Sequence, residues 1–125
     1  MSKDTVPPLD LYIKAASAKK AQNLVVLDVA ALTSIADVFM ICSGRSNRQV
    51  KAIADSIIVD LKKHKIKPLS VEGTAEGHWV LLDYGHVVIH VFYEPVREFF
   101  DLEGLWVDAK RIATPDMKKP QSSTN

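Results

Sequence analysis

The sequence has few cysteines, few aromatic residues and no long hydrophobic run. Cys42 is the only cysteine among 125 residues, which excludes an internal disulfide and any zinc or iron–sulfur site built from several thiolates. The apolar stretches, such as residues 87–91, fall far short of the roughly 20 residues that a membrane-spanning helix needs. An acidic residue and two prolines stand where a signal peptide would have its apolar region. We therefore expect a cytoplasmic protein without a membrane segment.

An excess of charge of one sign is also lacking. Lys and Arg number 16 and Asp and Glu number 15, which gives a net charge of +1. Such a chain is not drawn as a whole to nucleic acid or to an anionic membrane. Any RNA contact is expected to be local and peripheral, through Lys and Arg at positions 45, 48, 51 and 62–67, although solvated helix faces are the simpler explanation of these charges.

Length and composition indicate one compact domain. A chain that is 47% hydrophobic and 25% charged can bury one sizeable core but not two. The composition places the folded body at residues 8–112. Residues 1–7 are expected to be a flexible N-terminus, and residues 113–125, rich in Pro, Lys, Ser and Thr, a disordered tail.

Two segments have the apolar spacing of amphipathic helices. The first begins near Pro8, which suits a first helical turn, and runs through Ala16. In the second, Ser46 and Gln49 have the spacing of a capping box, and the helix is expected to end near residues 62–64. The apolar stripe of this second helix consists of Val50, Ile53, Ala54, Ile57, Ile58 and Leu61.

The remaining apolar segments are short and rich in β-branched residues, which is typical of strands. Glu94 and Pro95 open a short helix that ends at Phe100, and an aromatic segment follows at 102–106. This order of elements predicts an α/β fold, with a mixed five-stranded sheet and flanking helices. The expected strands are 24–29, 37–43, 69–72, 78–83 and 86–93.

The last two strands read as a hairpin with a two-residue turn at Tyr84 and Gly85. This register places Asp83 opposite His86, and it sorts the side chains onto two faces. The first face is aliphatic and is expected to be core: Val80, Leu82, Val87, Ile89 and Val91. The second mixes aromatic and titratable groups: Trp79, Leu81, Asp83, His86, Val88, His90 and Phe92.

The second face has two interpretations of about equal weight. Aromatic anchors within a polar surround are typical of protein interfaces. Alternatively, a second helix layer covers this face and leaves Asp83 and His86 as an exposed cross-strand pair.

Motifs for catalysis or cofactor binding are missing. His86 and His90 would lie about 13 Å apart along one strand, too far for one metal ion. The loop at 43–47 has the strand–turn–helix layout that can hold a phosphate, but it lacks a glycine-rich motif, and a capping role already explains Ser46. Cys42 lies in a predicted strand and is expected to be a buried, inert thiol. We therefore expect no enzyme activity, no cofactor and no metal, with a nucleotide-dependent enzyme and a self-associating module as alternatives.

The assembled motifs resemble the ribosomal silencing factor family, also called the Iojap-like family. The run W-V-L-L-D-Y-G at 79–85 is specific, and similar segments follow one another in the same order over nearly the whole body. Phe100 and Gly104 depart from the residues that are common in the family. The matching segments are 36–39, 43–54, 71–73, 79–85, 88–92, 97–103 and 105–106.

The resemblance implies a nucleotidyltransferase-like fold without the catalytic carboxylates. It also implies a translational repressor that binds the large ribosomal subunit through ribosomal protein fourteen (uL14) and blocks joining of the small subunit under nutrient limitation. Members are commonly homodimers when free. Together, the resemblance and the face argument nominate these partner-binding residues: Trp79, Leu81, Leu82, Asp83, Tyr84, Val88, His90 and Phe92.

Overall fold

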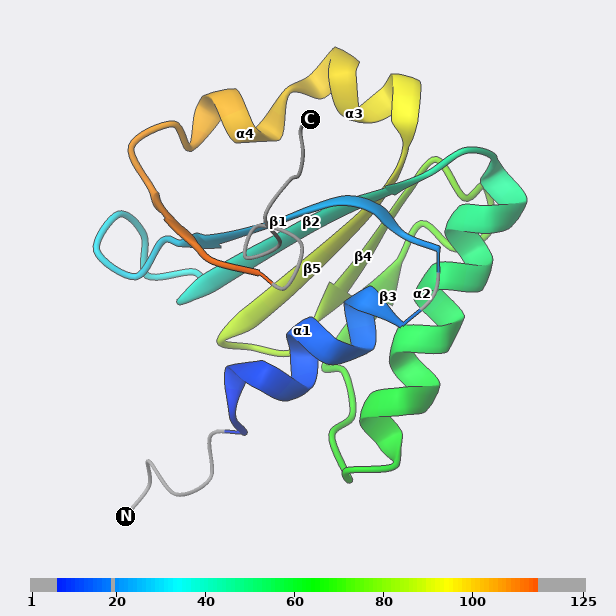
Figure 1. Ribbon diagram of the computed structural model, residues 1–125, viewed down its shortest axis with the longest axis horizontal. Coiled ribbons are helices and arrows are strands. Elements are labelled where there is room, and N and C mark those ends of the chain that lie inside the picture. The colour runs from blue at the N-terminus through cyan, green and yellow to red at the C-terminus, as the bar shows by residue number, and fades with distance from the viewer. Residues whose placement is uncertain (1–6, 19, 115–125) are drawn as a thin grey trace, which may run out of the picture.

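The computed structural model describes residues 7–18 and 20–114, which form one mixed sheet with helices on both faces (Figure 1). Helices α1 and α2 cover one face, and α3 and α4 lie over the other (Figure 1). The elements are α1 (Leu9–Ser17), β1 (Gln22–Asp28), β2 (Val38–Gly44), α2 (Asn47–Lys62), β3 (Ser70–Glu72), β4 (Trp79–Asp83), β5 (Val87–Tyr93), α3 (Glu94–Phe100), α4 (Leu102–Leu105) and β6 (Lys110–Ile112).

The sheet has the strand order β3-β4-β5-β2-β1-β6. Strand β2 pairs with β5 in parallel, and every other neighbouring pair is antiparallel. The α/β class and the mixed sheet are confirmed, but the sheet has six strands and not five. The additional strand, β6, holds only three residues, two of them charged, so its sequence carries no alternating pattern.

The two long predicted helices begin where their capping signals indicate. Ser46 Oγ accepts a hydrogen bond from the Gln49 backbone N–H at 3.1 Å, as a capping box requires. The Gln49 side chain in turn accepts from the backbone N–H of Arg45. Pro8 is the residue that precedes α1, and α2 ends at Lys62, at the start of the predicted range.

The β4–β5 turn differs from the prediction by one residue. The Tyr84 N–H donates to the Val87 carbonyl at 2.9 Å, so the turn residues are Gly85 and His86. Gly85 has a φ of +92°, and the Asp83 side chain accepts from its N–H at 2.8 Å. These local interactions favour the observed turn over the predicted one.

The turn changes the hairpin register by two residues. Asp83 pairs with Val88, where His86 was expected. An even shift keeps both predicted faces of the hairpin strands, because side chains alternate with a period of two. His86 is the exception, since its ring packs edge-on against Tyr12 of α1 at a centroid distance of 5.7 Å.

The predicted flexible N-terminus and disordered tail lie almost entirely outside the described residues. Within the described ranges, no helix is both long and apolar enough to cross a bilayer.

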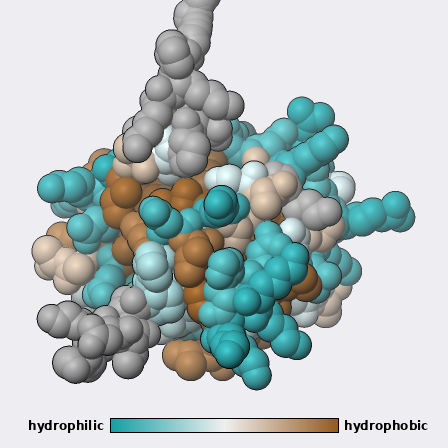
Figure 2. Space-filling view, turned by 60° about the horizontal axis from the view of Figure 1, so that its bottom comes forward, coloured by the Kyte–Doolittle hydropathy of each residue, from teal (hydrophilic) through white to brown (hydrophobic). Residues whose placement is uncertain are grey.

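Figure 2, which brings the lower side of Figure 1 forward, shows hydrophobic side chains gathered in one area among hydrophilic ones. A groove of about 540 Å³ runs between α1 and the end of β6, with Leu11 and Ile13 in its wall.

Cys42 is fully buried in β2, as the sequence predicts. Burial raises the pKa of its thiol to about 12, because the thiolate would lose its hydration, and the nearby Arg97 only partly opposes this effect.

We predict that Cys42 resists alkylation in the native protein. At pH 8, iodoacetamide should modify it at least about 100-fold more slowly than a free thiol, because the side chain is both inaccessible and protonated. Mass spectrometry over time measures the rate, and the same protein in urea is the control. Modification of the native protein at the rate of the unfolded chain would contradict this assignment.

Candidate partner-binding surface

Helices α3 and α4 cover only part of their face of the sheet. Helix α3 packs against β5 and β2, so the β3–β4 end of this face stays open to solvent. Trp79, Leu81 and Asp83 of β4 are half-buried there. Next to them on β3, Glu72 pairs with Leu81 and Ser70 pairs with Asp83. The sequence suggested either a covering helix layer or an open surface on this face. Both occur: the helices cover one part of the face, and the other part is open.

The structure separates the eight nominated residues into three groups. Val88, His90 and Phe92 are buried beneath α3 and α4. Leu82 and Tyr84 are buried on the opposite face, toward α1 and α2, so neither side chain lies on this surface, and Leu82 lies on the aliphatic face where the alternation predicted it. A partner that docks on the folded chain reaches only the third group directly, which is Trp79, Leu81 and Asp83.

The indole of Trp79 is held by its neighbours. Its ring centroid lies 4.7 Å from that of Phe92 and 5.1 Å from that of Phe100. Its Nε1–H donates to Nδ1 of His90 at 3.1 Å. The position of a half-exposed aromatic group is thus fixed before any partner arrives, which lowers the entropy lost on binding.

His90 is the acceptor for this hydrogen bond and is only 5% exposed. Burial lowers its pKa to about 4, because the imidazolium ion would be poorly solvated. The ring is therefore neutral near pH 7, and since Nδ1 accepts, the proton is on Nε2. His90 supports Trp79 from below and does not itself face a partner.

Sequence reasoning missed three exposed apolar side chains on the covering helices. Phe99 is 81% exposed, Phe100 48% and Leu105 75%. Phe99 and Phe100 contact each other edge-on, and Phe100 also contacts Trp79. The available signal was that two consecutive phenylalanines on one helix cannot both face the sheet. Phe99 and Phe100 extend the apolar area around Trp79 and define, with Trp79, Leu81 and Asp83, what we call the Trp79 surface.

The junction of α3 and α4 explains one departure from the family pattern. Asp101 has a left-handed backbone with a φ of +47°, and its carboxylate accepts from the Gly104 N–H at 3.2 Å. A Cβ at position 104 would collide with that carboxylate, so glycine fits this tight connection. Beneath the junction, the buried Arg97 guanidinium binds both carboxylate oxygens of Glu103, at 3.1 and 2.8 Å.

Charge is segregated along the chain. Residues 70–108, which include β3, β4, α3 and α4, contain eight acidic residues and one arginine. That arginine, Arg97, is paired with Glu103. Residues 45–67, which include α2, contain seven Lys or Arg against two Asp. The Trp79 surface therefore lies in an acidic region, and the basic residues accompany the helix on the other face of the sheet.

The βα turn at residues 43–47 begins in the core and reaches the surface, because Gly44 is buried and Arg45 and Ser46 are exposed. Ser43 is fully buried, and its Oγ accepts from Arg97 Nη1 at 2.6 Å. Gly44 packs tightly on Val50, so that a Cβ at this glycine would lie 3.1 Å from the valine side chain. Among the described residues, no cluster of three His, Cys, Asp or Glu is placed to hold a metal ion. The contacts of Ser43, Gly44 and Ser46 are those of core packing and helix capping.

Similarity to known proteins identifies the family of this chain. The family model described as "Ribosomal silencing factor during starvation" matches residues 3–125. The chain belongs to this family. Its relatives include the ribosomal silencing factor RsfS of Chromobacterium violaceum, which is 39% identical over 90% of this chain and 93% of that protein. RsfS of Bacillus subtilis is 40% identical over 81% and 86%.

Members of the silencing factor family with solved structures share the fold. A crystal structure of a Chromobacterium violaceum protein has a TM-score of 0.76 and 37% identity, and the match covers 91% of this chain and 95% of that one. A Bacillus halodurans structure has a TM-score of 0.74 and 35% identity, and the match covers 84% of this chain and 95% of that one.

A longer relative is known by its sequence. The Iojap protein of Arabidopsis chloroplasts is 35% identical, and the match covers 46% of its length.

Proposed function

We propose that this protein represses translation by binding the large ribosomal subunit through the Trp79 surface and so blocking the small subunit from joining. The observation that carries the proposal is the fixed, half-exposed indole beside exposed Phe99 and Phe100. Well-positioned aromatic groups at the centre of a contact supply most of the binding energy of protein interfaces. Membership of the silencing factor family supports the ribosome as the target.

A protein partner suits this surface better than RNA does. The acidic residues of segment 70–108 would repel phosphate, whereas they complement a basic ribosomal protein. Within the proposal, ribosomal protein fourteen (uL14) supplies that contact, with apolar groups around Trp79 as anchors and Asp83 as an orienting charge. The basic residues on and after α2 make any peripheral contact with ribosomal RNA in this proposal.

The proposed mechanism needs no chemistry. A folded domain on the subunit-joining surface excludes the small subunit by occupying its place, so no catalytic residue, cofactor or substrate is required. We place this activity in the cytoplasm, under nutrient limitation. The free protein is proposed to be a homodimer, and if the dimer uses the Trp79 surface, dimerisation and ribosome binding compete by mass action.

The test combines purified protein with isolated large subunits and pellets them through a sucrose cushion, before and after small subunits are added. Wild type should co-pellet and reduce joined ribosomes. Trp79→Ala should weaken binding by about 2 kcal/mol or more, roughly 30-fold, because it removes the anchor.

The matched control is Val59→Ala, which truncates an apolar side chain that is 48% exposed on α2, away from the Trp79 surface. It should bind like wild type, and circular dichroism checks the fold of both variants. Failure of wild type to co-pellet would refute ribosome binding, whereas normal binding by Trp79→Ala would refute only the assigned surface.

A further inference from the structure

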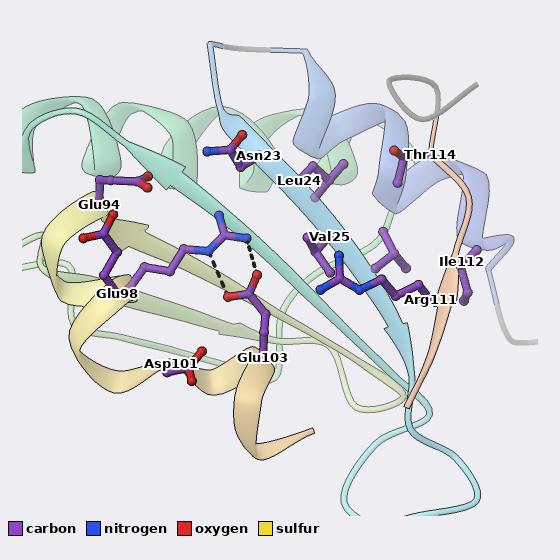
Figure 3. A pocket seen from close by; sticks show the side chains of 12 residues that line it. Asn23, Leu24, Val25, Glu94, Glu98, Asp101, Glu103, Arg111, Ile112 and Thr114 are labelled. Atoms are coloured by element: carbon purple, nitrogen blue, oxygen red, sulfur yellow. Dashed lines mark hydrogen bonds and ion pairs between the residues drawn. The ribbon is translucent and has the colours of Figure 1, made fainter. Parts of the chain in front are cut away.

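A cavity of about 610 Å³ opens between the α3–α4 layer and the outer edge of β1, away from the Trp79 surface (Figure 3). Its size is within the range of small-ligand sites in proteins. Helix α3 contributes Glu94 and Glu98, and Arg111 enters from β6 (Figure 3). The ionisable groups of the wall are Glu94, Arg97, Glu98, Asp101, Glu103 and Arg111.

The charges of this wall do not cancel. It holds four carboxylates and two guanidinium groups. Arg97 already has partners, because it donates two hydrogen bonds to Glu103 and one to Ser43. The hydrogen bonds from Arg97 lower the pKa of the Glu103 carboxyl, against the opposing effect of burial, and the positive charges of Arg97 and Arg111 lower it further. Glu94, Glu98 and Asp101 have no positively charged partner among the described residues. The cavity is therefore anionic on the side of α3.

Two polar atoms at the cavity are buried and have no hydrogen-bond partner. Thr114 is 1% exposed, and its hydroxyl oxygen makes no hydrogen bond. Oε1 of Glu94 is likewise buried and unpartnered. Buried polar atoms in native proteins nearly always have a hydrogen-bond partner. Because a carboxylate only accepts, the missing partner at Glu94 is a donor.

The cavity wall also includes an open strand edge. Strand β6 pairs with β1 only from Val26 to Asp28. The preceding part of β1, including Asn23, lines the cavity and pairs with no strand on that side among residues 7–18 and 20–114. A bound molecule thus has access to the carboxylates of α3 and to the threonine at the end of β6.

We propose that this cavity binds an organic cation that carries ammonium or guanidinium groups. Glu94 and Glu98 hold the positive charge through charge-assisted hydrogen bonds, and Thr114 Oγ1 accepts a further one. A free polyamine and a lysine or arginine side chain of another protein present the same chemistry. The site does not include the Trp79 surface, so the proposal does not depend on the proposed function.

Calorimetric titration of the full chain at low ionic strength uses two probes, spermidine and a capped peptide with two lysines. We expect Glu94→Gln with Glu98→Gln to weaken binding at least about tenfold, because two charged acceptors are lost. Thr114→Val, which keeps the side-chain shape, should weaken it a few-fold. The control, Glu72→Gln with Glu76→Gln, removes two exposed charges outside the cavity and should have little effect.

Amide chemical shifts in the NMR spectrum locate the bound probe and report whether each variant is folded. Binding of spermidine alone assigns a free polyamine, and binding of the peptide alone assigns a basic protein segment. Either supports the site if shifts occur at α3, β1 and β6. The proposal is overturned if neither probe binds, or if the control variant loses as much affinity as the cavity variant.

Discussion

Replacing Arg97 with alanine is expected to lower the free energy of unfolding by about 3 kcal/mol. Arg97 is 6% exposed and ties three elements together, because its guanidinium binds Glu103 of α4 and Ser43 of β2. Without it, the fully buried Ser43 hydroxyl loses its donor and Glu103 keeps an uncompensated charge. The Glu103 side chain is 23% exposed, which places the loss at the lower end of the range for buried ion pairs.

Urea denaturation of the variant measures this loss. A triple variant with Arg97→Met, Glu103→Leu and Ser43→Ala removes every partner together and should lie within about 1 kcal/mol of wild type, since no polar group is then left unpaired. Arg97 lowers the pKa of Glu103, so the pair contributes stability above the carboxyl's ordinary pKa of 4.5 and loses it as the pH falls further. A loss near zero in Arg97→Ala would show that the pair does not hold the α3–α4 layer.

Acid is expected to destabilise the protein through His90, before most carboxylates titrate. The pKa of His90 is lowered to about 4 in the folded chain from 6.5. The unfolded state therefore binds the proton first, and stability falls by about 1.4 kcal/mol per pH unit between these values. The full effect is about 3 kcal/mol. Protonation at Nδ1 would also remove the acceptor for the Trp79 indole.

His90→Asn separates this effect from general acid denaturation. Asparagine retains an acceptor near the position of Nδ1 but does not titrate, so its stability should be nearly flat from pH 6.5 to 5. His64→Asn, at an exposed histidine beyond α2, should keep the wild-type slope. Urea denaturation at several pH values provides the comparison. Equal slopes in wild type and His90→Asn would rule out His90 as the source.

The sequence predicted those parts of the fold that depend on interactions between residues close together in the chain. The capping box at Ser46 and Gln49 located the start of α2, and the even hairpin shift left the strand faces intact. The turn itself was missed because Tyr84 pairs with Val87 and Gly85 takes the left-handed conformation beside Asp83. A register error of two residues leaves every strand side chain on the face that was predicted for it, because side chains alternate between the faces with a period of two.

The candidate site was predictable only in part because it depends on how distant segments meet. Trp79, Leu81 and Asp83 followed from alternation, but the burial of Phe92 and His90 depends on where α3 lies. The exposed Phe99 could not be assigned without that placement. Arg97 reads as an ordinary surface charge, and nothing in its local sequence shows that it reaches Ser43, 54 positions earlier.

The separation of acidic and basic segments is expected to give this nearly neutral chain an electric dipole. Helix α2, within the basic segment 45–67, and helices α3 and α4, within the acidic segment 70–108, lie over opposite faces of the sheet (Figure 1). An electric field exerts only a small net force on a molecule with a net charge of +1, but it exerts a torque on the dipole of that molecule. In the field of a charged partner, such as the ribosomal subunit of the proposed function, this torque favours one orientation of the protein before contact, and the preference weakens as salt screens the field.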